Sequence, residues 1–346
     1  MRKARTAYRA APLLPLLFFL LDCAGSRPPA EDIFWPSPPE PARIKYLRSI
    51  SSLDDLDQGW FQNLKSALLG RDRQNGLLKP YGVAVDSRGR IFVSDAGNRS
   101  VLVFNEHPRS GEKYLEFLGT GGAGQLIEPA GVAVGLHDEI LVSDVIQRTV
   151  YEYGPDLQYR RTLGQSDTFT RPAGIAVNPG NGNIIILDAK AHNFRIFTPD
   201  GEELAVVGGP GTEPGRFNIP THVACDTAGR IYVVDSMNFR VQLFSPAGEY
   251  LSSFGQADNV PGSFSRPKGI ALDSEGHVYV ADSAFDNIQI FTPEGTLLLF
   301  FGSAGTRPGY FQLPAGICFD RQDRLFVVDQ YNRRIQIFQY LKASTL

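Results

Sequence analysis

Six residues at one position of a repeated pattern are the first candidates for binding chemistry. Each stands four residues after one of six regularly spaced aspartates, and its type changes from repeat to repeat. These residues are Arg99, Arg148, His192, Phe239, Asp286 and Arg333. Arginine forms charge-assisted hydrogen bonds with carboxylates and phosphates, and aromatic rings supply contact area. The set predicts a basic and aromatic rim for an acidic peptide or an anionic group; alternatively, the arginines pair with aspartates of the repeats.

A histidine is the sharpest break in the pattern. Five repeats open Pro-x-Gly, whereas the fourth has His222 in place of the glycine. Imidazole can bind ligands or transfer protons near neutral pH, although a lone histidine can also simply fill space. The residues directly after the six prolines also differ, and they are Tyr81, Ala130, Ala173, Thr221, Lys268 and Ala315. We expect recognition to concentrate around Tyr81, Arg99, His222 and Lys268.

The whole predicted ligand site consists of residues from these three positions of the repeat. It comprises Tyr81, Arg99, Arg148, His192, His222, Phe239, Lys268 and Arg333. None is assigned a catalytic or metal-binding role, and no cofactor is expected. The predicted partner is a protein or a small ligand on the face that bears the Pro-x-Gly loops.

A repeated unit must position these side chains. The last unit, from Pro314 to Phe338, reads as three strands separated by turns, and its relatives open at Pro80, Pro129, Pro172, Pro220 and Pro267. The intervals between the prolines are 49, 43, 48, 47 and 47 residues. Each unit then reaches an aspartate, and these are Asp95, Asp144, Asp188, Asp235, Asp282 and Asp329. Nine residues later comes an aromatic residue: Phe104, Tyr153, Phe197, Phe244, Phe291 or Phe338.

The period predicts the fold. Short strands repeated at this interval are typical of radial architectures in which each unit packs against its neighbours. Six units therefore predict an all-β fold, a six-bladed β-propeller. Within each unit we expect a glycine such as Gly316 at a tight turn into the innermost strand, and an Asp-x-x-Gly turn such as Asp86 to Gly89. The aromatic rings are expected between neighbouring sheets.

The units resemble the NHL repeat family, whose third element reads Asn-x-Arg-Ile-Gln-x-Phe. Asn238, Arg240, Gln242 and Phe244 match this element, and so does the corresponding run of the last unit. The resemblance covers about residues 43–338. It implies the propeller fold but no single function, because the family includes protein-binding and RNA-binding modules, receptor ectodomains and a few enzymes.

The segment Arg43 to Ile50 has no repeat of its own but resembles the outermost strand at Tyr250 to Phe254. The last unit lacks such a strand, because only eight residues follow Phe338. We therefore expect Arg43 to Ile50 to complete the last blade and to close the ring, which removes two free sheet edges.

One long insertion separates this strand from the first unit. It covers about residues 51–79, where Trp60, Phe61, Leu64 and Leu68 recur at helical spacing. This spacing predicts a short helix from about Leu56 to Leu69. The helix is expected to pack on the propeller rim or, alternatively, to dock on a membrane or a partner.

The N-terminal residues predict export. A basic start followed by the apolar run Ala11 to Leu21 indicates a signal peptide over residues 1–22. Cys23 follows Leu20-Leu21-Asp22, which resembles a bacterial lipobox, so Cys23 is the predicted lipidation site and residues 23–42 a proline-rich tether before the propeller of residues 43–346. The predicted location is the cell envelope, as a lipoprotein on the outer-membrane or periplasmic side. Cleavage after Ser26 would instead give a secreted protein.

Charge and cysteine content narrow the function classes. The formal net charge is −3, and it becomes −6 when residues 1–22 with their four basic residues and one acidic residue are removed. We therefore expect no general affinity for nucleic acid. Cys225 and Cys318 lie in innermost strands of non-adjacent units, which predicts buried free thiols and no disulfide between them.

Three classes of function then compete. A binding scaffold needs only a decorated face and an anchor, and this is the predicted function. The alternative is a propeller lyase or hydrolase with a metal at the central channel. An amidating lyase of the resembling family would need several inward histidines, whereas only His222 is axial here, with His192 as a possible neighbour; His107, His137 and His277 fall in turns. A calcium-dependent lactonase would need axial carboxylates, which the Pro-x-Gly segments do not supply.

Overall fold

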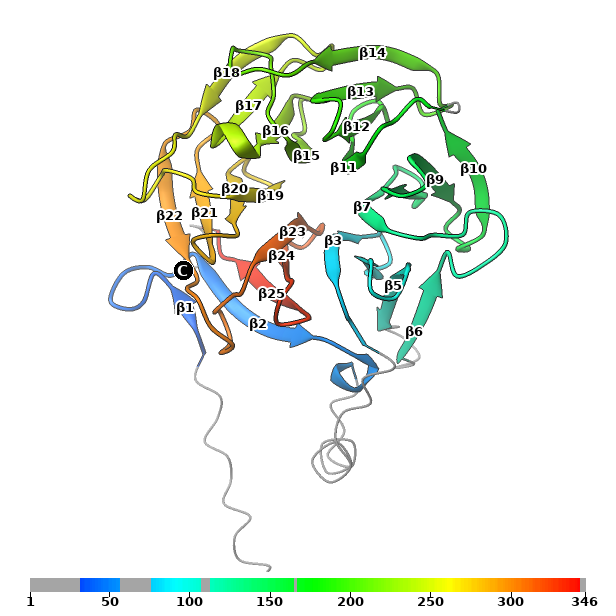
Figure 1. The fold of residues 1–346 in the computed structure, drawn as a ribbon. Coiled ribbons are helices and arrows are strands. Elements are labelled where there is room, and N and C mark those ends of the chain that lie inside the picture. The colour runs from blue at the N-terminus through cyan, green and yellow to red at the C-terminus, as the bar shows by residue number, and fades with distance from the viewer. Residues whose placement is uncertain (1–31, 57–75, 107–112, 165–166, 343–346) are drawn as a thin grey trace, which may run out of the picture. The chain divides into compact units, whose positions relative to one another are not determined.

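Six antiparallel sheets form a ring around a central axis (Figure 1). The computed structural model describes residues 32–56, 76–106, 113–164 and 167–342, and the ring belongs to the compact unit Ile33–Leu346. Five sheets have four strands each, and the sixth has five. The predicted six-bladed β-propeller is confirmed.

The strands of each blade follow one another along the chain from the axis outward. Blade 1 contains β3 (Pro80–Val85), β4 (Ile91–Asp95), β5 (Ser100–Glu106) and β6 (Lys113–Leu118). Blade 2 contains β7 (Pro129–Val134), β8 (Ile140–Asp144), β9 (Thr149–Tyr153) and β10 (Tyr159–Leu163). Blade 3 contains β11 (Pro172–Val177), β12 (Ile184–Asp188), β13 (Asn193–Phe197) and β14 (Glu203–Gly208).

The remaining blades repeat this order with two additions. Blade 4 contains β15 (Pro220–Cys225), β16 (Ile231–Asp235), the 3₁₀ turn η3 (Ser236–Asn238), β17 (Arg240–Phe244) and β18 (Tyr250–Phe254). Blade 5 contains β19 (Pro267–Leu272), β20 (Val278–Asp282), β21 (Asn287–Phe291) and β22 (Leu297–Phe301). Blade 6 contains β23 (Pro314–Phe319), β24 (Arg324–Asp329) and β25 (Arg334–Tyr340), completed by β2 (Ile44–Ile50) and β1 (Phe34–Trp35). A 3₁₀ turn, η1 (Leu53–Asp55), follows β2.

Close contact between innermost strands explains the repeated glycine. A Cβ atom at Gly131 would lie 2.2 Å from the carbonyl oxygen of Ala173, and one at Gly269 would lie 2.1 Å from that of Ala315. These glycines do not have the left-handed backbone conformation, so the expected tight turn is not the reason for them. Glycine is required because the backbone of the next blade passes where a side chain would be.

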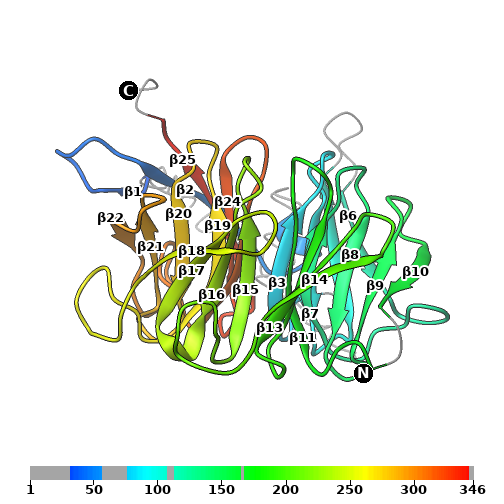
Figure 2. The ribbon, with the colours of Figure 1, turned by 90° about the horizontal axis from the view of Figure 1, so that it is seen from above.

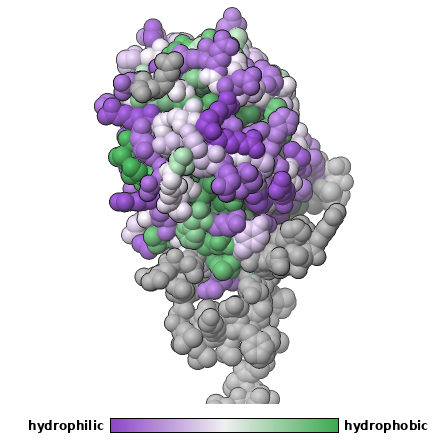
Figure 3. Space-filling model, turned by 90° about the vertical axis from the view of Figure 1, so that its right-hand side faces the viewer, coloured by the Kyte–Doolittle hydropathy of each residue, from purple (hydrophilic) through white to green (hydrophobic). Residues whose placement is uncertain are grey.

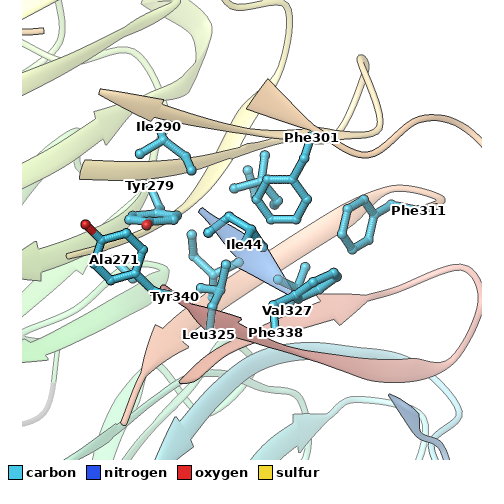
Figure 4. Close-up of a cluster of buried hydrophobic side chains, with 13 residues drawn as sticks. Ile44, Ala271, Tyr279, Ile290, Phe301, Phe311, Leu325, Val327, Phe338 and Tyr340 are labelled. Atoms are coloured by element: carbon cyan, nitrogen blue, oxygen red, sulfur yellow. The ribbon is translucent and has the colours of Figure 1, made fainter. Parts of the chain in front are cut away.

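The core lies between neighbouring blades. The aromatic residue that ends each unit is buried, as predicted: Phe104, Tyr153, Phe197, Phe244, Phe291 and Phe338 are each at most 2% exposed. Between blades 5 and 6, for example, the Phe338 ring lies 5.1 Å from the Phe301 ring and 5.9 Å from the Phe311 ring, measured between centroids (Figure 4). Each ring that leaves water in this way contributes roughly 1.5–3 kcal/mol to folding.

The repeated aspartates hold loops by hydrogen bonds. The carboxylate of Asp95 accepts hydrogen bonds from the backbone amides of Leu78, Lys79, Gly97 and Asn98 at 2.7–3.1 Å. One buried side chain thus ties the start of β3 to the turn after β4. Because a buried carboxylate without such donors would be costly, the aspartate recurs in all six units.

The N-terminal strand closes the ring, as predicted. β2 pairs with β25 in the antiparallel register Ile44↔Tyr340 to Ile50↔Ile335. The segment before β2 differs from the prediction that residues 23–42 form a tether outside the propeller. Phe34 and Trp35 form β1 against β2, and the Trp35 ring lies 5.3 Å from the Phe301 ring. Residues 34 and 35 join the sheet because Trp35 buries apolar surface against the last blade. Figure 2 shows the β1–β2 hairpin and the C-terminal end of β25 on the same side of the ring.

Several sequence predictions fall outside the described residues. These are the signal peptide, Cys23, and the helix expected over Leu56 to Leu69 apart from its first residue. Within the described ranges, no helix has the length and apolar character to cross a membrane. The outer strands carry exposed apolar side chains such as Leu204, Leu251 and Phe300. On the side of the ring seen in Figure 3, apolar patches are interspersed with a mostly hydrophilic surface.

Candidate functional site

The six Pro-x-Gly segments surround the mouth of the central channel on one face of the propeller, here called the proline face. Each innermost strand begins there, opposite the end of the second strand, as in the pairing Pro80↔Asp95. A cavity of about 240 Å³ lies at this mouth, and its lining includes Lys79, Tyr81, Arg171 and Gln330. The lining comes from five of the six blades, so ring closure creates the cavity.

Three of the predicted residues meet at the channel mouth, and one of them, Tyr81, lines this cavity. Tyr81 of blade 1 reaches His222 of blade 4, and the two ring centroids are 5.1 Å apart with an angle of 30° between the planes. The Nζ atom of Lys268 lies 5.9 Å from the centroid of the Tyr81 ring and donates a 3.4 Å hydrogen bond to Oε1 of Gln330. The side chain of Tyr81 therefore extends across the channel and covers His222.

His222 is a buried, neutral histidine. It is 9% exposed, and neither of its ring nitrogens has a hydrogen-bond partner in the described part of the chain. Burial lowers the pKa of His222 to about 3, and the positive charge of Lys268 also lowers it. The backbone of Lys268 raises this pKa and partly opposes the other two effects. A neutral imidazole with free nitrogens is available to a ligand only if Tyr81 moves aside.

The electrostatic surroundings of Tyr81 and Lys268 are positive. Burial raises the pKa of Tyr81 to about 12, while the nearby charges of Arg171 and Arg266 act to lower it. Burial together with Arg266 lowers the pKa of Lys268 to about 8. Cationic groups from several blades thus lie around the cavity, which one carboxylate, that of Glu128, also lines.

The cations that sequence reasoning missed share one position. Lys79, Arg171 and Arg266 each directly precede one of the repeat prolines, and all three are exposed on the proline face. In the other units this position holds Glu128, Ile219 and Leu313. The sequence therefore contained a signal for these cations, because the residue before each repeat proline varies as strongly as the residue after it.

The six rim residues share a left-handed backbone conformation. Their φ angles lie between 51° and 55°, and they are Arg99, Arg148, His192, Phe239, Asp286 and Arg333. Each is at the turn between the second and third strand of its blade. Such a φ is uncommon for residues other than glycine and requires support from the surrounding structure. The repeated aspartate provides this support, as when Asp95 Oδ1 accepts hydrogen bonds from the amides of Gly97 and Asn98.

Two rim residues hold the neighbouring blade. Nδ1 of His192 accepts a 3.2 Å hydrogen bond from the Ile219 amide, and Oδ1 of Asp286 accepts a 2.7 Å bond from the Leu313 amide. Both donors directly precede a repeat proline. His192, predicted as a ligand contact, therefore has a structural role between blades 3 and 4.

The rim arginines do not pair with the repeat aspartates. Two of those aspartates pair with other arginines: Arg240 Nε lies 2.8 Å from Asp235 Oδ2, and Arg334 Nε lies 2.7 Å from Asp329 Oδ2. Several cations of the proline face form no ion pair with a described residue, and these are Lys79, Arg99, Arg148, Arg171, Arg266 and Arg333. The expected pairing of the rim arginines with repeat aspartates is therefore not what the structure has.

The opposite face uses arginine differently. There Arg90, Arg230 and Arg324 each place Nε 2.6 Å from the aspartate four residues earlier. Their charges are neutralised within one turn, whereas the six cations named above are not paired in this way. The proline face therefore carries positive charges without ion-pair partners among the described residues, even though the whole chain is acidic.

The predicted residues are spread over different parts of the proline face. Tyr81, His222 and Lys268 meet at the channel mouth. Arg99 lines a separate depression together with Gln147. Arg333 lines another one, together with Tyr331. Phe239 and Arg148 line none of these pockets.

The donor set at the mouth does not suit a divalent metal. Across the described ranges, no group of three histidine, cysteine or carboxylate side chains is close enough to hold one. His222 is the single imidazole, and Lys268 with Arg266 would repel a cation. The residues present therefore do not fit the metal that a propeller lyase or hydrolase of the alternative kind would need.

Comparison with known proteins supports the fold and the repeat type. Four segments match the NHL repeat family model: residues 77–104, 169–197, 264–291 and 311–338. They lie in blades 1, 3, 5 and 6. No curated protein sequence matches the chain.

Solved structures with the same fold have different activities. Virginiamycin B lyase from Staphylococcus aureus is 13% identical, with 86% of this chain and 100% of that chain covered and a TM-score of 0.57. A gluconolactonase from Xanthomonas campestris is 17% identical, with 77% and 87% covered and a TM-score of 0.58. An auxiliary nutrient binding protein from Bacteroides thetaiotaomicron is 14% identical, with 77% and 70% covered and a TM-score of 0.59. At these identities the likeness is one of fold. The chain is a six-bladed β-propeller with four blades that match the NHL repeat.

Proposed function

We propose that this protein is a binding scaffold whose proline face captures an anionic ligand, such as an acidic segment of a partner protein. The observation that carries the proposal is the set of cations without ion-pair partners around the channel mouth, with Lys79 and Arg171 lining the cavity itself. Carboxylates would supply the missing charge partners. Tyr81 adds aromatic contact area at the centre.

The charge distribution supports an anionic partner in a second way. Unpaired cations on one face of an acidic protein orient an approaching anion toward that face. Most of these arginines and lysines are exposed. We therefore expect modest affinity with strong dependence on salt, since exposed charges are screened within about 10 Å at 0.1 M salt.

The test measures binding of a hexaglutamate peptide by calorimetry at low salt. Changing Lys79→Ala together with Arg171→Ala should weaken binding at least tenfold. The matched control is Arg88→Ala with Arg321→Ala, two exposed arginines in turns of the opposite face. A hexalysine peptide controls for the sign of the charge. Equal loss in both double variants, or equal binding of both peptides, would contradict the proposal.

Attachment to the cell envelope through Cys23 is part of the same proposal. The lipobox-like sequence and the proline-rich stretch support it. A lipid on Cys23 would keep the propeller at a membrane, where it would present the proline face to partners. A partner in the same envelope compartment is therefore expected.

A second candidate is a lyase or hydrolase activity. It is favoured by the fold shared with virginiamycin B lyase and gluconolactonase, and by a buried histidine at the channel mouth. No carboxylate orients His222, however, and cations surround it. Acid release from gluconolactone, lost in His222→Gly, would support this candidate over a scaffold. We expect no turnover.

A further inference from the structure

A larger cavity lies away from the proline face, between blades 5 and 6. Its volume is about 490 Å³, within the range of small-molecule sites. One wall is apolar, with Ile290 and Leu299 of blade 5. The other wall comes from Tyr340 at the end of β25 and from the segment between β1 and β2, including Arg43. Figure 4 shows Tyr279, Ile290 and Tyr340 together, on the side of the buried cluster away from Phe311.

The repeat changes at this cavity. In blades 1, 4 and 6 an arginine follows the turn aspartate by four residues and pairs with it. In blade 5 this position is His277, which lines the cavity and whose Nδ1 lies 2.9 Å from Asp273 Oδ2. The guanidinium of Arg324 lies over the ring of Phe326 in blade 6. Because arginine is longer than histidine, an arginine at position 277 would occupy part of the space that the imidazole leaves open.

Asp273 fixes the orientation of His277. Its carboxylate accepts hydrogen bonds from Nδ1 and from the backbone amide of His277, and it also accepts a 3.2 Å bond from the hydroxyl of Tyr279. The Asp273 side chain is fully buried and that of His277 is 27% exposed. With Nδ1–H engaged, Nε2 is the nitrogen available to a ligand, as an acceptor in the neutral ring.

Acidic groups outnumber basic groups at this cavity. Glu275, which accepts a hydrogen bond from the hydroxyl of Tyr340, lines the cavity together with the carboxylate of Glu40, against the single guanidinium of Arg43. Burial, the bond to Glu275 and the charges of Asp273 and Glu275 all raise the pKa of the Tyr340 hydroxyl, and only Arg43 opposes them. The cavity therefore attracts positive charge.

We propose that this cavity binds a small organic cation, a protonated amine with an apolar chain or ring. The ammonium group would donate hydrogen bonds to Glu275 and to Nε2 of His277. The apolar part would lie against Ile290 and Leu299, with the ring of Tyr340 beside the charge. The site is independent of the proline face, because it shares no residue with the cavity at the channel mouth.

The test is calorimetric titration of the full chain with phenethylamine, with 3-phenylpropionate as the probe of similar shape and opposite charge. We expect saturable binding of the amine and at least tenfold weaker binding of the carboxylate. His277→Arg should abolish amine binding, because it restores the arginine of blades 1, 4 and 6 and fills the space while keeping a partner for Asp273. Its thermal midpoint should stay close to that of the wild type, which separates loss of the site from loss of the fold.

Glu275→Gln supplies the charge test, with Glu249→Gln in an exposed turn of blade 4 as its control. The first change should weaken amine binding at least tenfold and the second should not alter it. The proposal is overturned if folded His277→Arg binds phenethylamine as well as the wild type does. Equal affinity for the carboxylate probe, or equal effects of the two glutamine variants, would overturn it as well.

Discussion

At the scale of single residues, His222 shows how one departure from a repeat changes local energetics. Five blades have glycine at this position because the next blade's backbone leaves no room for a side chain. Blade 4 accommodates an imidazole there but leaves both of its nitrogens without partners. A buried polar group without hydrogen bonds costs about 1–3 kcal/mol, so His222 is maintained at the expense of stability.

Replacing His222→Gly should therefore leave the protein as stable as the wild type or more stable at pH 7.5. The reverse exchange, Gly174→His, should lower the unfolding free energy by about 1–3 kcal/mol through overpacking. A Cβ atom at Gly174 would lie 2.8 Å from the Cα of His222 and 2.9 Å from the carbonyl oxygen of Thr221. Denaturant titration of the two variants measures both changes in unfolding free energy. A stable Gly174→His protein would show that the contact between these strands can relax.

The same histidine should make stability depend on pH. Its pKa is about 3 in the folded protein, against 6.5 when the chain is unfolded. The unfolded chain then binds the proton first, so stability falls as pH drops below 6.5, by about 2 kcal/mol at pH 5. His222→Gly should lose this part of the pH dependence. Parallel stability curves for both proteins between pH 7 and 5 would rule out a buried neutral His222.

A second prediction at the residue scale concerns the arginines of the opposite face. The side chains of Arg90 and Asp86 are 6% and 0% exposed, so Arg90→Ala leaves a buried carboxylate without its charge partner. We expect a loss of about 3–5 kcal/mol in unfolding free energy. Arg88→Ala, two residues away and exposed, should change stability by less than about 0.5 kcal/mol. Similar thermal midpoints for the two variants would argue against the structural role of Arg90.

At the scale of elements, the two N-terminal strands close the ring. β2 covers the edge of β25, and β1 carries Trp35 against the rings of Phe301 and Phe338. A free edge would leave backbone groups unpaired and would expose this apolar cluster to water. The closure therefore joins residues from the two ends of the propeller in one sheet.

Deleting residues 33–50 should lower the thermal midpoint sharply and promote association through the exposed edge of β25. Removing residues 342–346 should have little effect, because the side chain of Lys342 is exposed in its ion pair with Asp323. Trp35→Ala provides a graded version, with an expected loss of about 2 kcal/mol. Tyr331→Ala, at a residue that is 70% exposed, is its control. Unchanged melting of the deleted protein would show that β2 does not contribute to closure.

At the scale of the whole molecule, the two faces of the propeller differ in how their charges are used. On the opposite face Arg90, Arg230 and Arg324 are each paired within a single turn, whereas the six cations of the proline face named above form no ion pair with a described residue. An anchored propeller with one cationic face would select partners by charge and position. The proposed amine cavity lies apart from that face and does not contribute to it.

Attachment itself is the prediction at this scale. Cys23→Ser should move the protein from the membrane fraction to the soluble fraction of the cells that express it, because the lipid is the proposed anchor. Cys225→Ser is the control, since this thiol is free in an innermost strand and lies far from Cys23 in the sequence. If Cys23→Ser stays with membranes, another segment or a partner attaches the protein.

The sequence by itself determined the number of blades and the limits of their inner strands. Every repeat proline begins an innermost strand, and every repeat aspartate ends the next one. This is possible because each blade has the same local requirements. Its innermost strand approaches the next blade too closely for a side chain, its strands are joined by a tight turn, and its third strand buries an aromatic ring. It also located Tyr81, His222 and Lys268 as departures from the pattern, and the closing strand by its likeness to Tyr250–Phe254.

Only the tertiary structure decided which side chains meet. Tyr81 and His222 belong to blades 1 and 4, and they touch because the ring brings the starts of all the innermost strands to one mouth. The pairing of Arg334 rather than Arg333 with Asp329, like that of Arg240 with Asp235, depends on which residues face each other across a hairpin. The cavity beside His277 requires a wall from each end of the chain. Such contacts depend on closure of the ring, which brings together residues from units that are far apart in the sequence.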